Sequence, residues 1–379
     1  MRNYQLKIKV KIFFIIKNLS NAVGGAERVF CKISSLLDDK GHDITVITFD
    51  KDNNLNFYDI KKSIKRINLS IGNSSSKTNL SEYFRRIFAL RNLLSITKPD
   101  LVIGFMHSAY IPISFALLGK SVPLIASEHT AINHYFKRPI QFLLLLISSF
   151  LINRFTVLSL FIKSKYPYII SRKMVVIPNP VMAVNSLNKN DNIPKRNIIL
   201  SVGRLEEEKD HLTLIQSFAK IVKSHQDWDL HIIGEGKLKN KLHEKINSLG
   251  LIDRIYIKGF TKDIDSKYRE AKIFALPSKY EAFGLVTAEA MSYGIPCIGF
   301  ADCPGTNELI INDETGLLVK SSGNRSSSLA EGIERLISDE QYRICLGRAA
   351  REAIKKNFAD EEVAEAWEHL LYNVVKRNC

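Results

Sequence analysis

The sequence predicts an α/β protein with two doubly wound domains, each built on a parallel sheet that helices cover on both faces. Three observations lead to this prediction. Short apolar runs alternate with segments of helical periodicity along most of the chain. These runs are continuous rather than alternately polar, which is typical of strands buried in a parallel sheet. A chain of 379 residues is also long enough for two separate cores.

The first half of the chain shows the alternation with some gaps. We expect strands at 11–16, 43–49, 100–105, 123–128, 155–160 and 174–179, and helices at 25–41 and 82–96. The longest apolar stretch, residues 140–152, is too short to span a bilayer. We therefore expect a buried helix there, and the alternative is a helix that dips into a membrane.

The second half of the chain is more regular. We expect strands at 197–202, 230–236, 254–260, 272–278, 295–300 and 316–320, and helices at 211–225, 237–250, 263–271, 283–294 and 305–310. Gly250 is expected to stop the second of these helices, and Asp263 to cap the third.

The domain boundary is predicted in a polar, Asn-rich stretch with prolines at both ends. We place an N-terminal domain at 1–180, a linker at 181–196 and a C-terminal domain at 197–357. A last amphipathic helix at 358–379 could pack back on the N-terminal domain.

The charge of +15 is confined to the first half of the chain. Residues 1–180 contain 26 Lys and Arg against 10 Asp and Glu, a net charge of +16. Residues 181–379 contain 28 against 29, a net charge of −1. This asymmetry indicates an anionic partner for the first half: a nucleic acid, an anionic membrane surface or a phosphorylated substrate. The alternative is a basic surface that serves only solubility.

The cysteines indicate a reducing compartment. There are five, none in a C-x-x-C pair, so neither a disulfide framework nor a zinc site is expected. The apolar run near the N-terminus is too short for a signal peptide. We therefore expect a cytoplasmic protein.

In open parallel sheets, ligands bind outside the carboxyl ends of the strands. Arg204 and Lys209 follow the predicted strand at 197–202 and precede a helix. A cationic pair at a helix N-terminus suits a diphosphate. The alternative is that both cations pair with the acids at 206–208.

A second such position lies in the segment EAFGLVTAE, residues 281–289. Gly284 opens a helix and would let a ligand approach the backbone closely. Glu289 could accept hydrogen bonds from the two hydroxyls of a ribose, and Glu281 from hydroxyls of a group beyond the phosphates. The alternative is a helix-capping acid and a surface acid.

The first domain offers two further candidates at strand ends. Gly24 and Gly25 present bare backbone amides to an anion before a helix. His107 and His129 follow two other strands, and His129 is the better candidate for a cleft; a structural histidine is the alternative for His107. Neither G-x-G-x-x-G nor a P-loop motif occurs, so nicotinamide binding and NTP hydrolysis are weakly supported.

Five motifs, in the order VGGAER, SEHT, VGRLEEEKD, EAFGLVTAEAMSYGIPCI and GLLV, resemble those of the family-4 retaining glycosyltransferases of the GT-B fold. The resemblance covers nearly the whole chain and is closest to bacterial enzymes of surface polysaccharide or lipid-linked oligosaccharide assembly. It implies two Rossmann-like domains whose parallel sheets face a central cleft. The segment ADCPG at 301–305 departs from the Gly-Gly of many members.

The resemblance implies a role for each matching residue. Arg204 and Lys209 would bind the donor diphosphate, and Glu289 the ribose. Glu281 and the amides of Phe283, Gly284 and Leu285 would hold the donor sugar and its phosphate. Gly24 and Gly25 would approach the phosphates, and His129 the donor sugar near the reacting carbon.

The resemblance also implies the reaction and its partners. Transfer would retain the anomeric configuration, and it would need neither a divalent metal nor a cofactor. The donor would be a nucleotide sugar, with UDP favoured by family habit. The acceptor, bound by the first domain, would be a saccharide linked to a lipid diphosphate. The basic first half would then face the anionic inner leaflet of the cytoplasmic membrane as a peripheral protein.

Two alternatives stay open at this point. An epimerase or phosphorylase of the same fold is disfavoured by the charge asymmetry and by the combination of Gly-Gly with G-R-x4-K. A basic nucleic-acid-binding protein would explain the charge, but neither aromatic residues interleaved with basic ones nor a reading helix is evident. We therefore expect no nucleic-acid partner.

Overall fold

The computed structural model describes residues 9–19, 24–50, 58, 60–72, 79–130, 132–136, 138–181, 194–261 and 263–376. The chain divides into two compact units. Unit 1 comprises Met1–Pro180 and Asp360–Cys379, and unit 2 comprises Val181–Ala359. Most of the linker predicted at 181–196 lies outside the described residues.

Unit 1 is a seven-stranded sheet, in the described residues, with the order β3-β2-β1-β4-β5-β6-β7. Every pairing in it is parallel. The strands are β1 (Lys11–Ile16), β2 (Asp43–Thr48), β3 (Lys65–Asn68), β4 (Leu101–Phe105), β5 (Leu124–Ser127), β6 (Arg154–Val157) and β7 (Met174–Val176).

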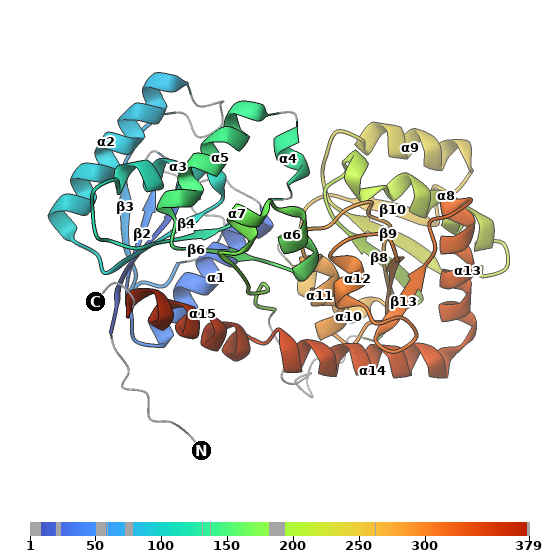
Figure 1. The fold of residues 1–379 in the computed structure, drawn as a ribbon. Helices are drawn as coiled ribbons and strands as arrows, with labels where there is room; N and C mark the ends of the chain where they lie inside the picture. Colours follow the sequence, from blue (N-terminus) through green and yellow to red (C-terminus); the bar gives the residue numbers. More distant parts are fainter. Residues whose placement is uncertain are drawn as a thin grey trace, which may run out of the picture. The chain divides into compact units, whose positions relative to one another are not determined.

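The helices of unit 1 cover the sheet, and all but the last of them lie between its strands in the chain (Figure 1). They are α1 (Gly25–Asp39), α2 (Leu80–Thr97), α3 (His107–Ala116), α4 (Asn133–Phe136), α5 (Pro139–Leu151), α6 (Leu160–Lys165), α7 (Tyr168–Ser171) and α15 (Asp360–Val375). Helix α15 follows unit 2 in the chain but packs against α1. The Trp367 ring of α15 stacks on Phe105 with 6.4 Å between ring centroids.

Unit 2 is a six-stranded sheet in the described residues, with the order β10-β9-β8-β11-β12-β13 and parallel pairing throughout. Its strands are β8 (Ile198–Val202), β9 (Asp229–Ile233), β10 (Ile255–Lys258), β11 (Ile273–Leu276), β12 (Cys297–Phe300) and β13 (Gly316–Val319). Its helices are the 3-10 turn η1 (Glu207–Lys209), α8 (His211–Ile221), α9 (Lys239–Ser248), α10 (Ile264–Glu270), α11 (Leu285–Ser292), α12 (Thr306–Leu309), α13 (Arg325–Ser338) and α14 (Glu340–Asn357).

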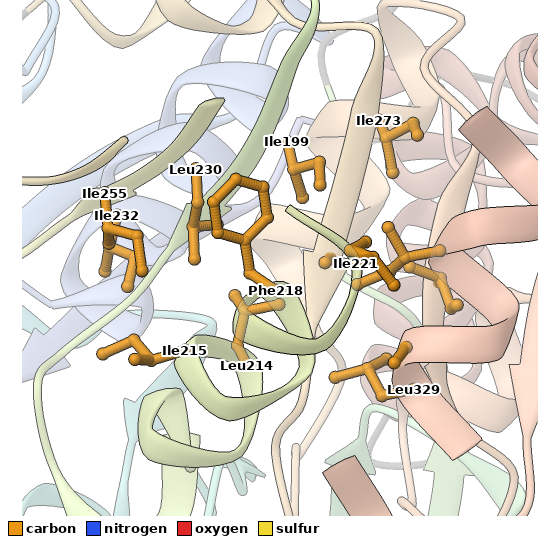
Figure 2. Close-up of a cluster of buried hydrophobic side chains, with 14 of the residues drawn as sticks. Ile199, Leu214, Ile215, Phe218, Ile221, Leu230, Ile232, Ile255, Ile273 and Leu329 are labelled. Carbon is orange, nitrogen blue, oxygen red and sulfur yellow. The ribbon is translucent and has the colours of Figure 1, made fainter. Parts of the chain in front are cut away.

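The core of unit 2 lies between the sheet and helices α8 and α13. Figure 2 shows Phe218 of α8 beside Ile199 and Leu230 of the central strands, with Leu329 of α13 close by. All four side chains are completely buried. Strands β8 and β11 form the middle of the sheet and are almost entirely buried, as continuous apolar runs predict.

The prediction of two doubly wound parallel sheets is confirmed, and the Asp263 side chain does cap α10 by accepting from the amide of Ser266. Strand β3 was missed because it is a short, half-exposed edge strand with charged residues at its start. The strand predicted at 155–160 ends early, because Ser159 caps α6 by accepting from the amide of Ile162.

The expectation of a buried helix at 140–152 was wrong in one respect. The helix forms as α5, but its buried residues are Leu145, Ser148 and Ser149, while several of its large apolar side chains face solvent. In a stretch that is apolar on every side, periodicity cannot indicate which face points inward. In the described part of the chain, no helix is both long enough and apolar enough to cross a membrane.

Candidate active site

The strand order places the candidate residues of unit 2 at one point of the sheet edge. Strands β8 and β11 are hydrogen-bonded neighbours, although β9 and β10 lie between them in the chain. The order of connection therefore reverses between them, which is where doubly wound sheets bind ligands. Arg204 and Lys209 follow β8, and Glu281 follows β11.

Lys209 and Glu281 form a nearly buried ion pair at this point. The Nζ atom of Lys209 lies 2.5 Å from Oε1 of Glu281, and the two side chains are 14% and 10% exposed. The hydroxyl of Ser278 donates to the same carboxylate oxygen at 2.6 Å. Removal from water strengthens such a pair and fixes both side chains. Lys209 therefore does not pair with the neighbouring acids, which was the alternative.

Arg204 has a different environment. Its side chain is 69% exposed and pairs with Glu208 over 2.8 Å, on the same loop. This is the ion pair that the alternative interpretation expected. Exposed pairs of this kind contribute little free energy. A diphosphate could therefore replace Glu208 as the partner of the Arg204 guanidinium at low cost.

Helix α11 begins one turn after Glu281. Gly284 is its N-cap with a φ of +82°, a conformation that glycine adopts without strain, and no side chain caps the helix. The Phe283 ring is buried against Phe358 with 5.6 Å between centroids. Phe283 therefore anchors the loop from the inside, while the first-turn amides, beginning with that of Leu285, project from the helix end.

Glu289 lies in the second turn of α11 and is 8% exposed. Its Oε2 atom accepts a hydrogen bond from the hydroxyl of Tyr268 at 3.0 Å. The Tyr268 ring stacks on Tyr293, with 5.3 Å between centroids. The carboxylate is thus held in a defined orientation and is not the surface acid of the alternative interpretation.

The segment that departs from Gly-Gly, residues 301–305, packs directly on the Glu281 loop. The amide of Glu281 donates to the carbonyl of Pro304 at 3.1 Å. A Cβ atom on Gly305 would lie 2.7 Å from the carbonyl oxygen of Glu281, and Gly305 has a φ of +78°. A side chain there would displace the loop, so this segment positions Glu281.

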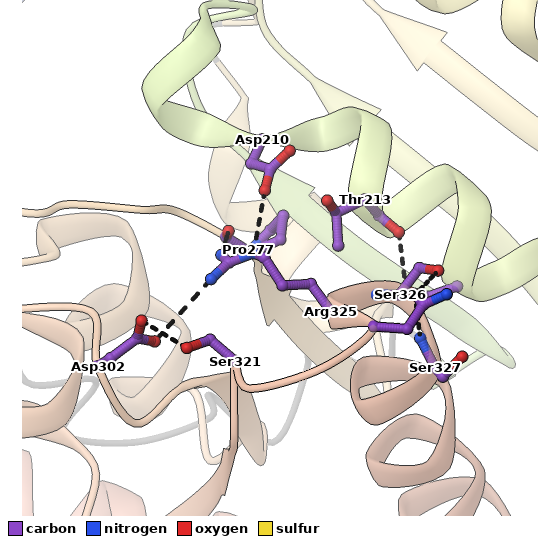
Figure 3. A network of polar contacts seen from close by, with 10 residues as sticks. Asp210, Thr213, Pro277, Asp302, Ser321, Arg325, Ser326 and Ser327 are labelled. Carbon is purple, nitrogen blue, oxygen red and sulfur yellow. Dashed lines mark hydrogen bonds and ion pairs between the residues drawn. The ribbon is translucent and has the colours of Figure 1, made fainter.

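Arg325 is the positioning residue that the sequence analysis missed (Figure 3). Its guanidinium donates to the carbonyl of Pro277 at 3.1 Å and lies 3.4 Å from Asp210 and 3.9 Å from Asp302. It also covers the Phe300 ring, 3.7 Å from the centroid. One cation therefore joins the loops that follow η1, β11 and β12.

The residues that Arg325 contacts are next to site residues in the sequence. Asp210 follows Lys209 directly, and Pro277 precedes Ser278. Arg325 is the first residue of α13, where the helix dipole disfavours a cation. The helix that Arg325 begins was not predicted either; its amphipathic pattern with a basic residue at the start was the signal that could have marked Arg325.

In unit 1, His129 follows β5 and is held from two sides. Its Nε2 atom lies 2.9 Å from the Ser127 hydroxyl, which itself accepts from Thr156 at 2.9 Å. The imidazole stacks on Phe105, with 5.1 Å between centroids. Burial lowers the pKa of His129 to about 4, so the ring is neutral at pH 7.

Glu128 precedes His129 and was not singled out in the sequence. It is buried, and it accepts from the hydroxyls of Tyr110 at 2.5 Å and Tyr135 at 2.9 Å and from the amide of Thr130 at 2.7 Å. Burial raises the pKa of this carboxyl. These bonds fix the turn that carries His129.

His107 begins α3, directly after Met106, whose φ is +65°. Burial, followed by the charges of Arg138 and Lys17, lowers the pKa of His107 to about 4. Its Nδ1 atom is buried, and within the described residues it has no hydrogen-bond partner.

Gly24 is the N-cap of α1 and Gly25 its first residue, so the two glycines do lie at a helix N-terminus. A Cβ atom on Gly24 would lie 2.0 Å from Oε2 of Glu27. The Glu27 carboxylate thus lies beside the position where an anion was expected, and burial raises its pKa. An anion at this helix start would have to displace it.

The described part of the chain contains no group of three or more His, Cys, Asp or Glu side chains that could hold a metal ion.

Two all-parallel, doubly wound units, one with a lysine, an arginine and two held carboxylates at its switch point, define the GT-B class of protein. Comparison with known sequences identifies the family. Residues 23–183 match Glycosyltransferase Family 4, and residues 185–353 match Glycosyl transferases group 1. The chain belongs to the family-4 type of GT-B glycosyltransferases and is an enzyme of this kind.

Two bacterial glycosyltransferases with specific names are similar over nearly their whole length. A GalNAc-α-(1→4)-GalNAc-α-(1→3)-diNAcBac-PP-undecaprenol α-1,4-N-acetyl-D-galactosaminyltransferase of Campylobacter jejuni is 28% identical, and the alignment covers 96% of this chain and 99% of that protein. The amylovoran biosynthesis glycosyltransferase AmsD of Erwinia amylovora is also 28% identical, over 95% of this chain and 99% of that protein.

Solved structures share the fold. The sucrose-phosphate synthase of Thermosynechococcus elongatus superposes with a TM-score of 0.82 at 19% identity, over 97% of this chain and 99% of that one. The Anabaena protein HepE in complex with UDP-glucose superposes with a TM-score of 0.74 at 18% identity, over 96% and 100%.

Proposed function

We propose that this enzyme transfers a hexose or N-acetylhexosamine from a UDP-sugar to a lipid-linked saccharide during surface polysaccharide assembly. We further propose that the transfer retains the anomeric configuration and needs no divalent metal. The observation that carries the proposal is the Lys209–Glu281 pair at the switch point of unit 2, with Arg204 exposed on the same loop.

The donor diphosphate would bind to Arg204, Lys209 and the N-terminus of α11. Transfer breaks the bond between the sugar and the β-phosphate and forms a bond to an acceptor hydroxyl, whose proton is released. The leaving UDP gains negative charge in this step. Two cations and a helix N-terminus stabilise such charge at positions already fixed before the reaction. This is the physical reason for proposing metal independence.

The two glutamates would bind hydroxyls. The Tyr268 bond leaves Glu289 oriented as an acceptor, which supports its assignment to the ribose. Glu281 would hold the donor sugar, and Lys209 would then bridge this carboxylate and the phosphate. The roles of Gly24, Gly25 and His129 toward the donor stay predictions, and a neutral His129 could offer a polarisable hydrogen-bonding ring to the sugar.

The acceptor assignment rests on similar proteins and on charge. The Campylobacter relative acts on a saccharide linked to undecaprenol diphosphate, and AmsD serves amylovoran biosynthesis. Residues 1–180, with a net charge of +16, would attract a lipid diphosphate and the anionic leaflet that contains it. We accordingly propose a cytoplasmic enzyme attached peripherally to the inner face of the membrane.

Calorimetric titration of the full chain with UDP and with GDP, in the presence of EDTA, tests the donor site. We expect UDP to bind without metal and Arg204→Ala to weaken it at least about 10-fold, since charge-assisted hydrogen bonds contribute roughly 1.5–3 kcal/mol. Arg348→Ala is the matched control, because Arg348 is exposed on α14. Binding of neither nucleotide, or equal losses in both variants, would refute this donor site.

A further inference from the structure

The outward face of α5 is unusual for a surface helix. Four of its large apolar side chains are exposed: Ile140 (75%), Leu143 (56%), Ile147 (44%) and Phe150 (67%). Their spacing of three, four and three residues places them on one side of the helix. The stripe extends over about 15 Å at 1.5 Å per residue. Phe136 of α4, which is 74% exposed, lies just before it.

The inward face of the same helix carries both of its serines, while its one other polar side chain, Gln141, is exposed. Ser148 and Ser149 are buried together with Leu145. Their hydroxyls donate to the carbonyls of Leu145 and Leu146 within the helix, so they need no water. Helix α5 contains no charged residue. This arrangement is the reverse of a helix whose outer face meets water, where apolar residues point inward.

Helix α2 adds a second stripe on the same side of the sheet. Leu80, Phe84 and Phe88 follow each other at four-residue intervals and are 80%, 56% and 63% exposed. Both α2 and α5 pack against α3 (Figure 1). The surfaces of soluble proteins normally show single, scattered apolar residues. Here the exposed apolar residues form stripes on two helices that pack against the same neighbour. We name the exposed large apolar residues of α4 and α5 the α5 stripe: Phe136, Ile140, Leu143, Ile147 and Phe150.

The surroundings of the stripe are basic. From residue 79 to residue 180 the sequence contains three acids. Glu82 and Glu128 are buried, which leaves Asp100 as the exposed acid of this segment. The exposed Arg138 directly precedes α5, and at its other end the Lys173 ammonium donates to the carbonyls of Ser149 and Ile152, with the exposed Arg172 beside it in the chain. An apolar stripe without carboxylates and with cations near both ends is complementary to the acyl chains and phosphates of anionic lipids.

The same charges argue against a second copy of this chain as the occupant. A twofold interface would bring one basic surface against an identical one, and like charges across an interface cost free energy. A lipid surface has no such conflict.

We propose that the α5 stripe docks the enzyme on anionic membranes, with α5 lying in the headgroup region parallel to the bilayer surface. This inference does not depend on the donor site, because it rests on surface residues of unit 1 alone. The stripe assigns membrane attachment to one face of one helix. The net charge of residues 1–180 assigns it only to that half of the chain. Contact would combine apolar insertion with attraction of the flanking cations to lipid phosphates.

Flotation of the full chain with phosphatidylcholine vesicles, with and without phosphatidylglycerol, tests the proposal. We expect binding that requires phosphatidylglycerol and weakens with salt. A variant with Ile140→Gln, Leu143→Gln, Ile147→Gln and Phe150→Gln should lose at least about 10-fold in vesicle affinity, because four apolar side chains no longer leave water on binding. UDP affinity should not change, which shows that the variant is folded and separates this test from the donor site.

The matched control replaces exposed apolar residues of unit 2 with Ile252→Gln, Ile311→Gln and Ile344→Gln. It should bind vesicles like the wild type. A single Leu143→Trp variant adds a local probe, and its added fluorescence should shift to the blue with anionic vesicles. Equal losses in both multiple variants, an unshifted fluorescence signal from the introduced indole or an absence of wild-type binding would overturn the proposal. A dimer in solution that the α5 variant abolishes would also overturn it, in favour of a second copy.

Discussion

At the scale of single residues, the two glutamates of EAFGLVTAE differ in what holds them. Glu281 is bound by the ammonium of Lys209 and the hydroxyl of Ser278. Glu289 accepts from the phenol of Tyr268. A cation that is paired with a carboxylate can also bind a phosphate, so Glu281 can share Lys209 with a ligand. A carboxylate that is oriented by a neutral phenol can accept hydrogen bonds from further hydroxyls. The two acids therefore have distinct chemical capacities.

This difference predicts separate effects on binding and turnover. Glu289→Ala should weaken UDP binding about 10-fold or more, because a pair of charge-assisted bonds to the ribose is lost. Glu281→Ala should leave UDP binding near the wild-type level, because Lys209 becomes free for the phosphate, and should lower kcat instead. Calorimetry and initial rates measure the two effects, with Glu308→Ala, at an exposed position, as control. Equal effects on binding would contradict this division.

At the scale of elements, the site depends on loops that the Arg325 side chain joins. The guanidinium contacts the residues next to Lys209 and Ser278 and lies near Asp302 at the start of the 301–305 segment. The planar fork of arginine can serve several acceptors at once, which a lysine ammonium does less well. The Asp302 carboxylate is held in turn by the Ser321 hydroxyl at 2.6 Å.

Replacing this residue should affect the reaction more than the fold. Arg325→Met should lower kcat about 10-fold or more and cost roughly 1–3 kcal/mol of unfolding free energy, the usual penalty of unpaired polar groups. Arg325→Lys should restore part of the rate. Arg335→Met is the control on the same helix, because Arg335 is 53% exposed and pairs with Asp313. A loss of stability with an unchanged kcat would leave Arg325 without a positioning role.

At the scale of the whole molecule, two separate segments of the chain build unit 1. Helix α15 returns to it after unit 2 and buries Trp367 against the aromatic cluster of Phe14, Phe30 and Phe105. Charged pairs between α1 and α15, such as Lys32 with Asp360 at 2.5 Å, lie around this contact. The stability of unit 1 therefore depends on the last residues of the chain.

Removing the buried ring should destabilise one unit. Trp367→Ala should lower the unfolding free energy of unit 1 by about 3–5 kcal/mol, as large-to-small core changes do. The variant retains a single tryptophan, the buried Trp228 of unit 2, as a local fluorescence probe. In urea, circular dichroism should show an early transition that Trp228 fluorescence does not follow. Glu365→Ala, at an exposed position of α15, should change neither signal, and coincident transitions in Trp367→Ala would show that the units unfold together.

Much of the fold could be predicted because strand and helix periods are local properties of the sequence. The strands that carry the site, β8 and β11, were predicted from continuous apolar runs, and the rule that ligands bind at carboxyl ends then led to Arg204, Lys209 and Glu281. The pairing of Lys209 with Glu281 could not be predicted, because 72 residues separate them and only the sheet order makes them neighbours. Arg325 was missed for the same reason, because its partners Asp210 and Pro277 lie far from it in the sequence.

By itself, the sequence determined the two parallel-sheet domains, the basic first half and the motifs of a glycosyltransferase, since composition, period and short spacing are written along the chain. Only the tertiary structure decided which cations meet which carboxylates, and that α5 turns its serines inward and its apolar stripe outward. These features depend on which surfaces the packing of distant segments covers. Local sequence patterns contain no information about that covering.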